Sequence, residues 1–135
     1  LPDAEDDDPG PGRGFVDVFG TDGRFVQRLI SRGALNSPWG MAMEAAPAGK
    51  LGTRLLVGNF GDGKVHVYRL ISLGKFHLAF LEGALGDTEH RPLVIDGLWA
   101  LSFGSGGAGF DGNALYFTAG PNDEEDGLFG QLDFQ

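Results

Sequence analysis

The apolar residues of this chain come in short runs that are separated by turns rich in Gly, Asp and Ser. Short runs enriched in Val, Phe, Leu and Tyr are typical of β-strands, and glycine interrupts them too often for an amphipathic helix. The sequence therefore predicts an all-β chain without helices. The expected strands are nine and cover residues 15–19, 24–30, 39–43, 54–60, 64–70, 76–81, 94–103, 114–119 and 128–134.

Two kinds of local signal refine this prediction. Thr21-Asp22-Gly23 and Gly61-Asp62-Gly63 are turn sequences between apolar runs, and they predict β-hairpins. Three runs, at residues 55–57, 98–103 and 114–117, are apolar at nearly every position. Such runs indicate strands that are covered on both faces, so we expect the sheets to be stacked on one another.

The pattern also repeats along the chain. Trp39 and Trp99 lie 60 residues apart, and Leu55 and Leu115 have the same offset. Each Trp therefore has the same place relative to the strand that follows, and we expect both to be largely buried at the start of equivalent innermost strands. Self-similarity at such a period predicts a repeat architecture, here a repeated β-blade.

The repeat divides the chain into unequal parts. Residues 1–13 carry five carboxylates and three prolines, and they predict a flexible acidic arm. Residues 14–135 predict propeller blades: a partial blade at 14–35, a full blade at 36–85 and a partial blade at 86–135. Propellers have about 4–8 blades of four strands, so about two and a quarter blades do not close a ring. We therefore expect these blades to pair with another copy or with the remainder of the same propeller.

Because the chain begins with Leu1 rather than Met, we also expect a processed, truncated or excised chain.

Charge and composition exclude several classes of protein. The formal net charge is −9, and nine of the 19 carboxylates lie in two clusters, at residues 3–8 and 123–126. The remaining chain is balanced and has no basic face, which excludes a nucleic-acid footprint. The absence of cysteine excludes disulfides and thiolate metal sites. No apolar run reaches the roughly 18 residues of a membrane-spanning helix, so no membrane partner is expected.

Four segments carry a family resemblance: LNSPWGMA, LLVGNFGDGKV, IDGLWALSFGSGGAG and ALYFTAGPNDEEDGLFGQL. They resemble an uncharacterised, mostly secreted family of six-bladed β-propeller proteins that is distantly related to NHL-repeat propellers. The resemblance extends over residues 14–132, and the connection at 83–92 departs most from the family pattern. It implies a six-bladed ring of which this chain is less than half, and a secreted or extracellular protein. The family has no established activity.

Asp96, in the segment Ile95-Asp96-Gly97, is the candidate for chemistry. In related gluconolactonase-type propellers, an Asp before Gly at the start of an inner strand serves a channel metal. That resemblance makes Asp96 a candidate metal ligand and a candidate catalytic base toward a metal-bound water, with Asn36 as a second oxygen ligand. The alternative is that both side chains accept backbone N–H bonds where the chain turns into the strand.

Two further groups of residues have a binding and a structural interpretation. Asp123, Glu124, Glu125 and Asp126 form an oxygen-rich turn that is a candidate Ca²⁺ site, although it lacks the alternating spacing of a calcium loop. The alternative is a solvated, exposed hairpin tip. Trp39 and Trp99 are candidates for a platform on which a sugar stacks, and the alternative is that they pack between blades.

These observations favour a non-catalytic propeller scaffold or binding module of unknown ligand. A metal-dependent lactonase-type hydrolase that uses Asp96 and a sugar-binding propeller are the two alternatives.

Overall fold

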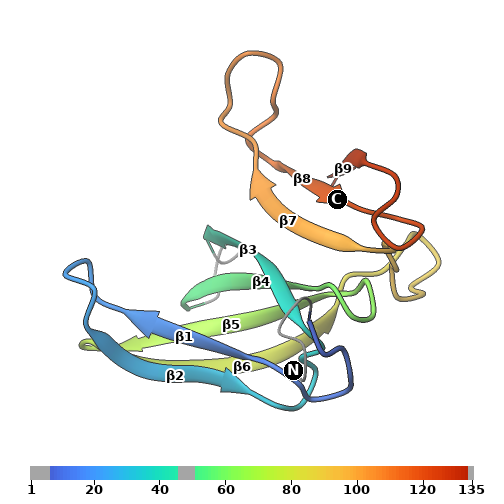
Figure 1. Ribbon diagram of the computed structural model, residues 1–135. Helices are drawn as coiled ribbons and strands as arrows, with labels where there is room; N and C mark the ends of the chain where they lie inside the picture. The colour runs from blue at the N-terminus through green and yellow to red at the C-terminus, as the bar shows by residue number, and fades with distance from the viewer. Residues whose placement is uncertain (1–6, 46–50, 134–135) are drawn as a thin grey trace.

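The computed structural model describes residues 7–45 and 51–133, and these form nine strands and no helix. The prediction of an all-β chain with nine strands is confirmed. The strands form three antiparallel sheets, which we call the first, central and third sheet (Figure 1). The first sheet contains β1 (Phe15–Phe19) and β2 (Phe25–Ser31). The central sheet has the order β3 (Pro38–Ala45), β4 (Thr53–Asn59), β5 (Val65–Leu73) and β6 (Phe76–Ala84), and the third has β7 (Leu98–Phe103), β8 (Ala114–Ala119) and β9 (Leu128–Asp133).

Three predicted strand boundaries are wrong by three or four residues. The structure extends β5 to Leu73 rather than 70 and β6 to Ala84 rather than 81. The third sheet begins at Leu98 rather than at residue 94, because Gly97 has a left-handed backbone with φ of +63° that interrupts an extended chain. The predicted end of the last strand at residue 134 lies outside the described residues.

The sheets stack face on face with an offset. The first sheet lies on one face of the central sheet, with β2 against β6. The third sheet lies on the opposite face, with β7 against β3 and β4 (Figure 1). Each neighbour therefore covers a different half of the central sheet.

Two apolar cores fill the spaces between the sheets. The core between the first and central sheets consists of Val16, Ile30, Leu35, Leu55, Val57, Tyr68 and Leu70. The core between the central and third sheets consists of Ala42, Leu56, Val65, Val67, Ile95, Leu98, Leu101, Leu115, Phe117 and Ala119. Consecutive residues of β4 point into alternate cores, so the prediction that residues 55–57 are covered on both faces is confirmed. Residues 114–117 are also buried. The same prediction is wrong for 98–103, because Ala100 and Ser102 lie on the free outer face of the third sheet and are exposed.

The offset leaves two corners of the central sheet uncovered. Met41 and Met43 pair with Val57 and Leu55 and share their face, yet both are about half exposed because the first sheet does not extend over β3. On the opposite face, three apolar residues of β6 are similarly exposed because the third sheet does not extend over it. These residues are Phe76, Leu78 and Phe80.

The part of the acidic arm that the structure describes is held in place. The N–H of Gly12 donates to the carbonyl of Leu35 at 2.7 Å, and the N–H of Ser37 donates to the carbonyl of Arg13 at 3.2 Å. The main chain of Gly12 and Arg13 is thus hydrogen-bonded to the turn that precedes β3. Residues 1–6 lie outside the described residues.

Candidate functional site

The start of β3 is fixed to the turn between β4 and β5. The carbonyl of Asn36 accepts the N–H of Gly61 at 3.0 Å, and the carbonyl of Ser37 accepts the N–H of Phe60 at 2.8 Å. The Asn36 side chain is buried, and its Oδ1 accepts the N–H of Gly10 at 2.7 Å. Asn36 thus serves as a backbone acceptor that joins the acidic arm to this strand.

The start of β7 repeats this arrangement 60 residues later. The carbonyl of Gly97 accepts the N–H of Gly120, at the end of β8, at 2.8 Å. Oδ2 of Asp96 accepts the N–H of Asn122 at 3.2 Å. The side chains of Asp96 and Asn36 therefore both accept a backbone N–H bond, as their alternative, structural interpretation expects.

The two tryptophans occupy equivalent positions. Each is the second residue of the first strand of its sheet, which confirms the predicted equivalence of Trp39 and Trp99. The prediction that Trp39 is largely buried is wrong, because this residue is 51% exposed. Its ring is stacked on Phe60, with the ring centroids 5.7 Å apart. Trp99 is half-buried, and it lies against the main chain at Gly120, where a Cβ atom would be 2.3 Å from the indole ring.

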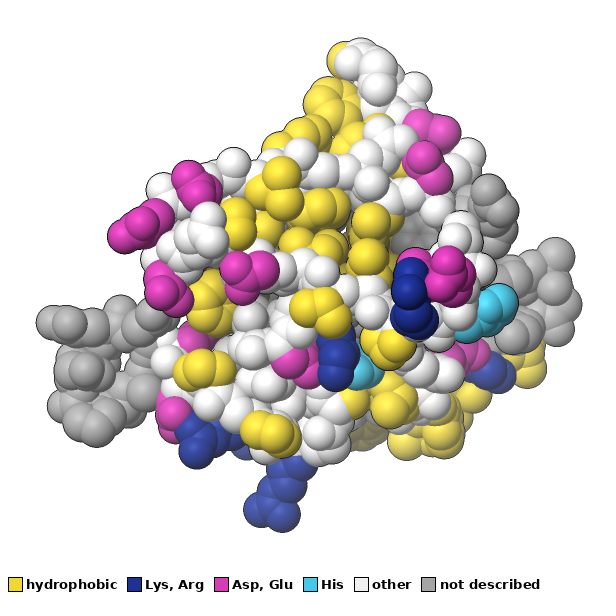
Figure 2. Space-filling model, turned by 90° about the vertical axis from the view of Figure 1, so that its right-hand side faces the viewer, with side chains coloured by type: hydrophobic (Ala, Val, Ile, Leu, Met, Phe, Trp, Pro, Cys, Tyr) yellow, Lys and Arg dark blue, Asp and Glu magenta, His cyan; other side chains and the backbone are white. Residues whose placement is uncertain are grey.

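Both indole N–H groups donate to a carboxylate from one of the two acidic clusters. Trp39 donates to Oδ2 of Asp7, and Trp99 donates to Oε1 of Glu124 at 2.6 Å. Figure 2 looks onto the end of the molecule where β3 and β7 start, and acidic side chains flank an apolar middle there. The N–H that would bind a sugar hydroxyl is thus already occupied on both tryptophans.

The acidic hairpin between β8 and β9 is exposed, as the structural alternative expects. Its backbone is unusual, because Asn122, Asp123 and Glu124 are consecutive non-glycine residues with φ of 58°, 54° and 64°. Each such residue costs about 1–2 kcal/mol. The resulting left-handed turn directs Glu124 back to Trp99, and Nδ2 of Asn122 donates to Asp126 at 2.7 Å.

These arrangements do not assemble the candidate metal sites. Within residues 7–45 and 51–133, no three His, Asp or Glu side chains are grouped so that they could hold a metal ion. The oxygen-rich turn uses Glu124 for Trp99 and Asp126 for Asn122. Asp96, Glu124 and Asp126 thus each accept a hydrogen bond from within the chain.

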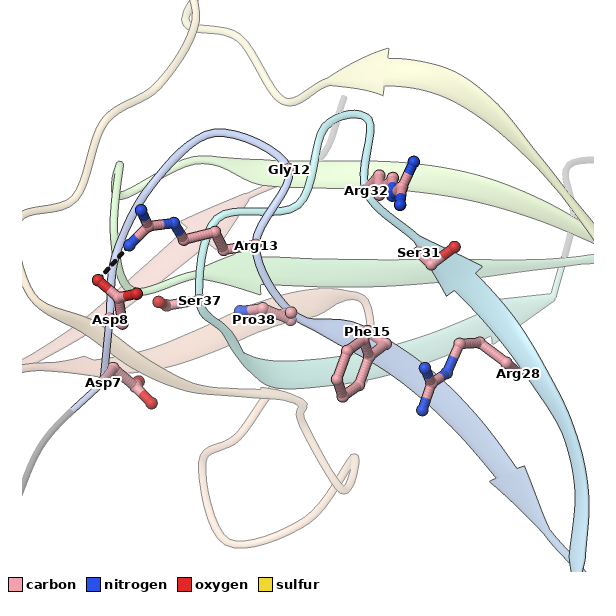
Figure 3. A pocket seen from close by; sticks show the side chains of 11 residues that line it. Asp7, Asp8, Gly12, Arg13, Phe15, Arg28, Ser31, Arg32, Ser37 and Pro38 are labelled. Carbon is pink, nitrogen blue, oxygen red and sulfur yellow. Dashed lines mark ion pairs between the residues drawn. The ribbon is translucent and has the colours of Figure 1, made fainter. Parts of the chain in front are cut away.

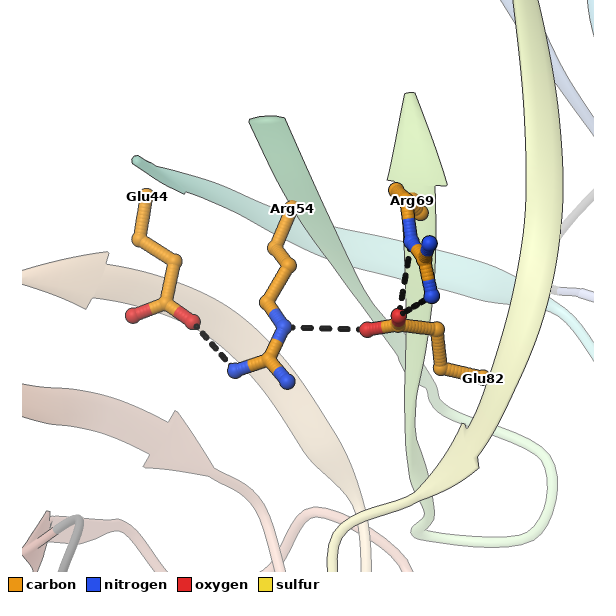
Figure 4. A network of polar contacts seen from close by, with 4 residues as sticks. All are labelled: Glu44, Arg54, Arg69 and Glu82. Atoms are coloured by element: carbon orange, nitrogen blue, oxygen red, sulfur yellow. Dashed lines mark hydrogen bonds and ion pairs between the residues drawn. The ribbon is translucent and has the colours of Figure 1, made fainter. Parts of the chain in front are cut away.

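A row of four charged side chains crosses the central sheet (Figure 4). Arg54 donates to Glu44 at 3.3 Å and to Glu82 at 3.0 Å, and Arg69 donates to Glu82 at 2.8 Å through Nε. Hydrogen bonds from Arg69 and Arg54 hold the pKa of Glu82 below its usual range, against the smaller effect of desolvation. The row is electrically neutral, and it contributes to structure rather than offering a free charge.

A wide depression of about 1010 Å³ opens beside the first sheet (Figure 3). Phe15 lies under the guanidinium of Arg28, 3.8 Å from the ring centroid, and Arg28 also forms an ion pair with Asp17 at 2.8 Å. Arg13 forms an ion pair with Asp8 at the opposite side of the depression. Arg32 also lines it and, among the described residues, has no ion pair.

One polar residue that is fully buried, Asn59, was not predicted from the sequence. Its Nδ2 donates to the carbonyl of Ala34 at 2.8 Å, and its Oδ1 has no hydrogen-bond partner. Burial lowers the pKa of His66, whose Nδ1 lies 3.4 Å from the same Nδ2. The signal in the sequence is a polar Asn inside the predicted strand 54–60, two residues after its apolar run at 55–57.

Comparison with known proteins found relatives without an assigned activity. The chain is 38% identical over 122 residues to an uncharacterized protein of Acanthamoeba polyphaga mimivirus, which is 90% of this chain and 30% of the relative. A second uncharacterized protein of the same virus is 33% identical over 123 residues, which is 91% of the chain and 28% of that relative. The chain thus spans less than a third of the length of the curated relatives it matches. No family model and no solved structure matches it.

No helix that is long and apolar enough to cross a membrane occurs among the described residues.

Proposed function

We propose that the chain is a segment of a β-propeller and that it serves as a non-catalytic scaffold or binding module. The observation that carries this proposal is the way in which the sheets stack. The first strand of the third sheet, β7, lies on the first strand of the central sheet, β3, and the last strand of the first sheet, β2, lies on the last strand of the central sheet, β6. In a propeller, the first strand of each blade lies nearest the central channel and the last strand lies outermost. Neighbouring blades therefore place first strands against first strands and last strands against last strands.

The length of the relatives supports the same proposal. Because 122 residues are 30% of the first relative, that protein is about 400 residues long. A period of 60 residues fits into this length between six and seven times, within the range of about 4–8 blades of known propellers. The uncovered corners at Met41 and Met43 and at β6 lie where strands that complete the neighbouring blades would pack.

The side chains support a non-catalytic role. The lactonase alternative requires Asp96 to hold a metal or to act as a base on a metal-bound water. Oδ2 of Asp96 instead accepts a backbone N–H, and the described residues near it supply no further group of metal ligands. The apolar faces of the sheets are therefore the features of this chain that are suited to binding.

Thermal unfolding of the chain with Ca²⁺, with Zn²⁺ and with a panel of glycans tests this proposal. A metal at 100 times its Kd would add about 2.7 kcal/mol of stability, which is an increase of several degrees in Tm for a domain of this size. We expect no such increase with either metal, and the same result for Asp96→Asn. A metal-dependent increase that Asp96→Asn abolishes would contradict the proposal and favour the hydrolase. An increase with a glycan alone would support a binding module and identify its ligand class.

A further inference from the structure

The two end sheets each have one face that no other sheet in the described part of the chain covers, and both of these faces are aromatic. On the first sheet, Phe15, Phe19 and Phe25 are each more than half exposed. On the third sheet, Phe129 is 61% exposed and is stacked on Tyr116, with ring centroids 5.8 Å apart. Exposed apolar surface of this kind on a folded chain marks an interaction site.

The two end sheets also differ in charge. Residues 13–35, which include the first sheet, carry four arginines and two aspartates. Residues 96–133, which include the third sheet, carry seven carboxylates and no Lys or Arg. Three of the four arginines are already ion-paired: Arg13 with Asp8, Arg24 with Asp22 and Arg28 with Asp17. The charge complementarity of the two ends therefore lies between the acidic third sheet and Arg32, and both free faces are apolar. Such complementarity favours association between the two ends and disfavours pairing of two identical ends.

The position of the charges along the strands agrees with this pairing. Arg32 lies in the turn after β2, at the end of the molecule where β3 and β7 start, and no carboxylate pairs with it among the described residues. The acidic hairpin at 121–127 lies at the same end (Figure 1). If a third sheet stacks on a first sheet in the orientation that the sheets have within the chain, the acidic hairpin approaches Arg32.

We propose that the free face of the third sheet of one copy binds the free face of the first sheet of a second copy, in a heterologous, head-to-tail contact. This inference rests on the proposed propeller-type stacking, because it continues the order seen within the chain. There, the central sheet meets the first sheet with one face and the third sheet with the other. A heterologous contact produces a ring where the rotation closes and an open chain of copies where it does not.

Two variants that each block one face provide the test. Phe25→Glu blocks the first-sheet face, and Phe129→Arg blocks the third-sheet face. We expect wild-type protein to form species larger than a dimer in sedimentation velocity at micromolar concentration, and each variant alone to be weakened at least about tenfold, which is about 1.4 kcal/mol. A mixture of the two variants retains one intact face of each kind, and we expect it to form a 1:1 complex that goes no further.

The mixture separates loss of binding from loss of folding, because a misfolded variant would not complete the complex. Phe80→Glu is the matched control, since Phe80 is an equally exposed aromatic residue (51%) on β6, away from both faces. It is expected to leave association unchanged. Monomeric wild-type protein, a mixture that stays monomeric, or an equal loss with Phe80→Glu would each overturn the head-to-tail contact. None of these outcomes bears on the metal and glycan measurements that test the proposed function.

Discussion

The starts of β3 and β7 have the same backbone and different side chains. At both, a residue with a left-handed backbone, Ser37 with φ of 49° or Gly97 with φ of 63°, gives its carbonyl to an N–H at the end of the next strand. In the central sheet that strand end presents Phe60, and in the third sheet the equivalent residue is Gly120. Trp39 is consequently held away from the main chain by a ring, whereas Trp99 lies directly on it.

This difference shows which parts of the repeat are required. The backbone path and the hydrogen bond to the carbonyl of Ser37 or Gly97 occur at both strand starts. Between the tryptophan and the main chain, the central sheet has the ring of Phe60, whereas in the third sheet the tryptophan contacts the main chain directly. The arrangement in the third sheet depends on Gly97 and Gly120, whereas the central sheet has no glycine at the equivalent positions. The third sheet is therefore the more sensitive of the two to added side-chain atoms.

The largest effect is expected for Gly97→Ala. Its Cβ would lie 2.0 Å from the carbonyl oxygen of Gly120, a backbone atom that cannot move without breaking the bond between them. Overpacking of about 1–3 kcal/mol adds to about 1–2 kcal/mol for a left-handed alanine. We expect a loss of about 3 kcal/mol in the free energy of unfolding, measured by urea denaturation.

Gly106→Ala is the matched control for this prediction. Gly106 also has a left-handed backbone, with φ of 75°, but no atom lies within 4 Å of the position of its Cβ. Its substitution reports the conformational cost alone, about 1–2 kcal/mol. Equal losses for the two variants would show that Gly97 and Gly120 do not approach closely.

The next effect is expected for Gly120→Ala, which places a methyl group 2.3 Å from the ring of Trp99. The ring must shift, so we expect a loss of about 1–3 kcal/mol together with a changed emission of Trp99 in a Trp39→Phe background. Gly127→Ala controls for the substitution itself, because its Cβ would meet no atom within 4 Å. An unchanged Trp99 emission in Gly120→Ala would mean that the indole does not lie on this residue.

Much of this fold, but little of the site, was predictable from the sequence. The nine strands follow from short apolar runs and turn residues, and the offset of Trp39 and Trp99 identifies equivalent strand starts. The exposure of Trp39 was not predictable, because it depends on how far the first sheet extends over the central one. The contact of Glu124 with Trp99 was also out of reach. It requires three consecutive left-handed residues, and although Asn122 and Asp123 tolerate this backbone, Glu124 has no such preference.

The charged row of the central sheet, formed by Glu44, Arg54, Arg69 and Glu82, has no equivalent in the third sheet. Arg54 at the start of β4 has Ala114 as its equivalent 60 residues later, and Glu44 has Gly104. A carboxylate that is held by two arginines is therefore specific to the central sheet. Protonation of Glu82 in acid should therefore lower the stability of the central sheet, and the described strands of the third sheet have no carboxylate in an equivalent position.

The smallest effect concerns Glu82→Gln and its dependence on pH. Arg69 and Arg54 depress the pKa of Glu82 below its ordinary value of 4.5, so the ionised carboxylate contributes stability above that pH and loses it as the pH falls through the folded-state pKa. We expect wild-type protein to be more stable than Glu82→Gln at pH 7, and the difference in free energy of unfolding to shrink steadily below pH 4.5. Glu125→Gln, at an exposed carboxylate with no ion pair in the described hairpin, serves as the control and should show no such convergence. A difference between wild type and Glu82→Gln that stays constant from pH 7 to pH 3 would exclude the row as a source of acid sensitivity.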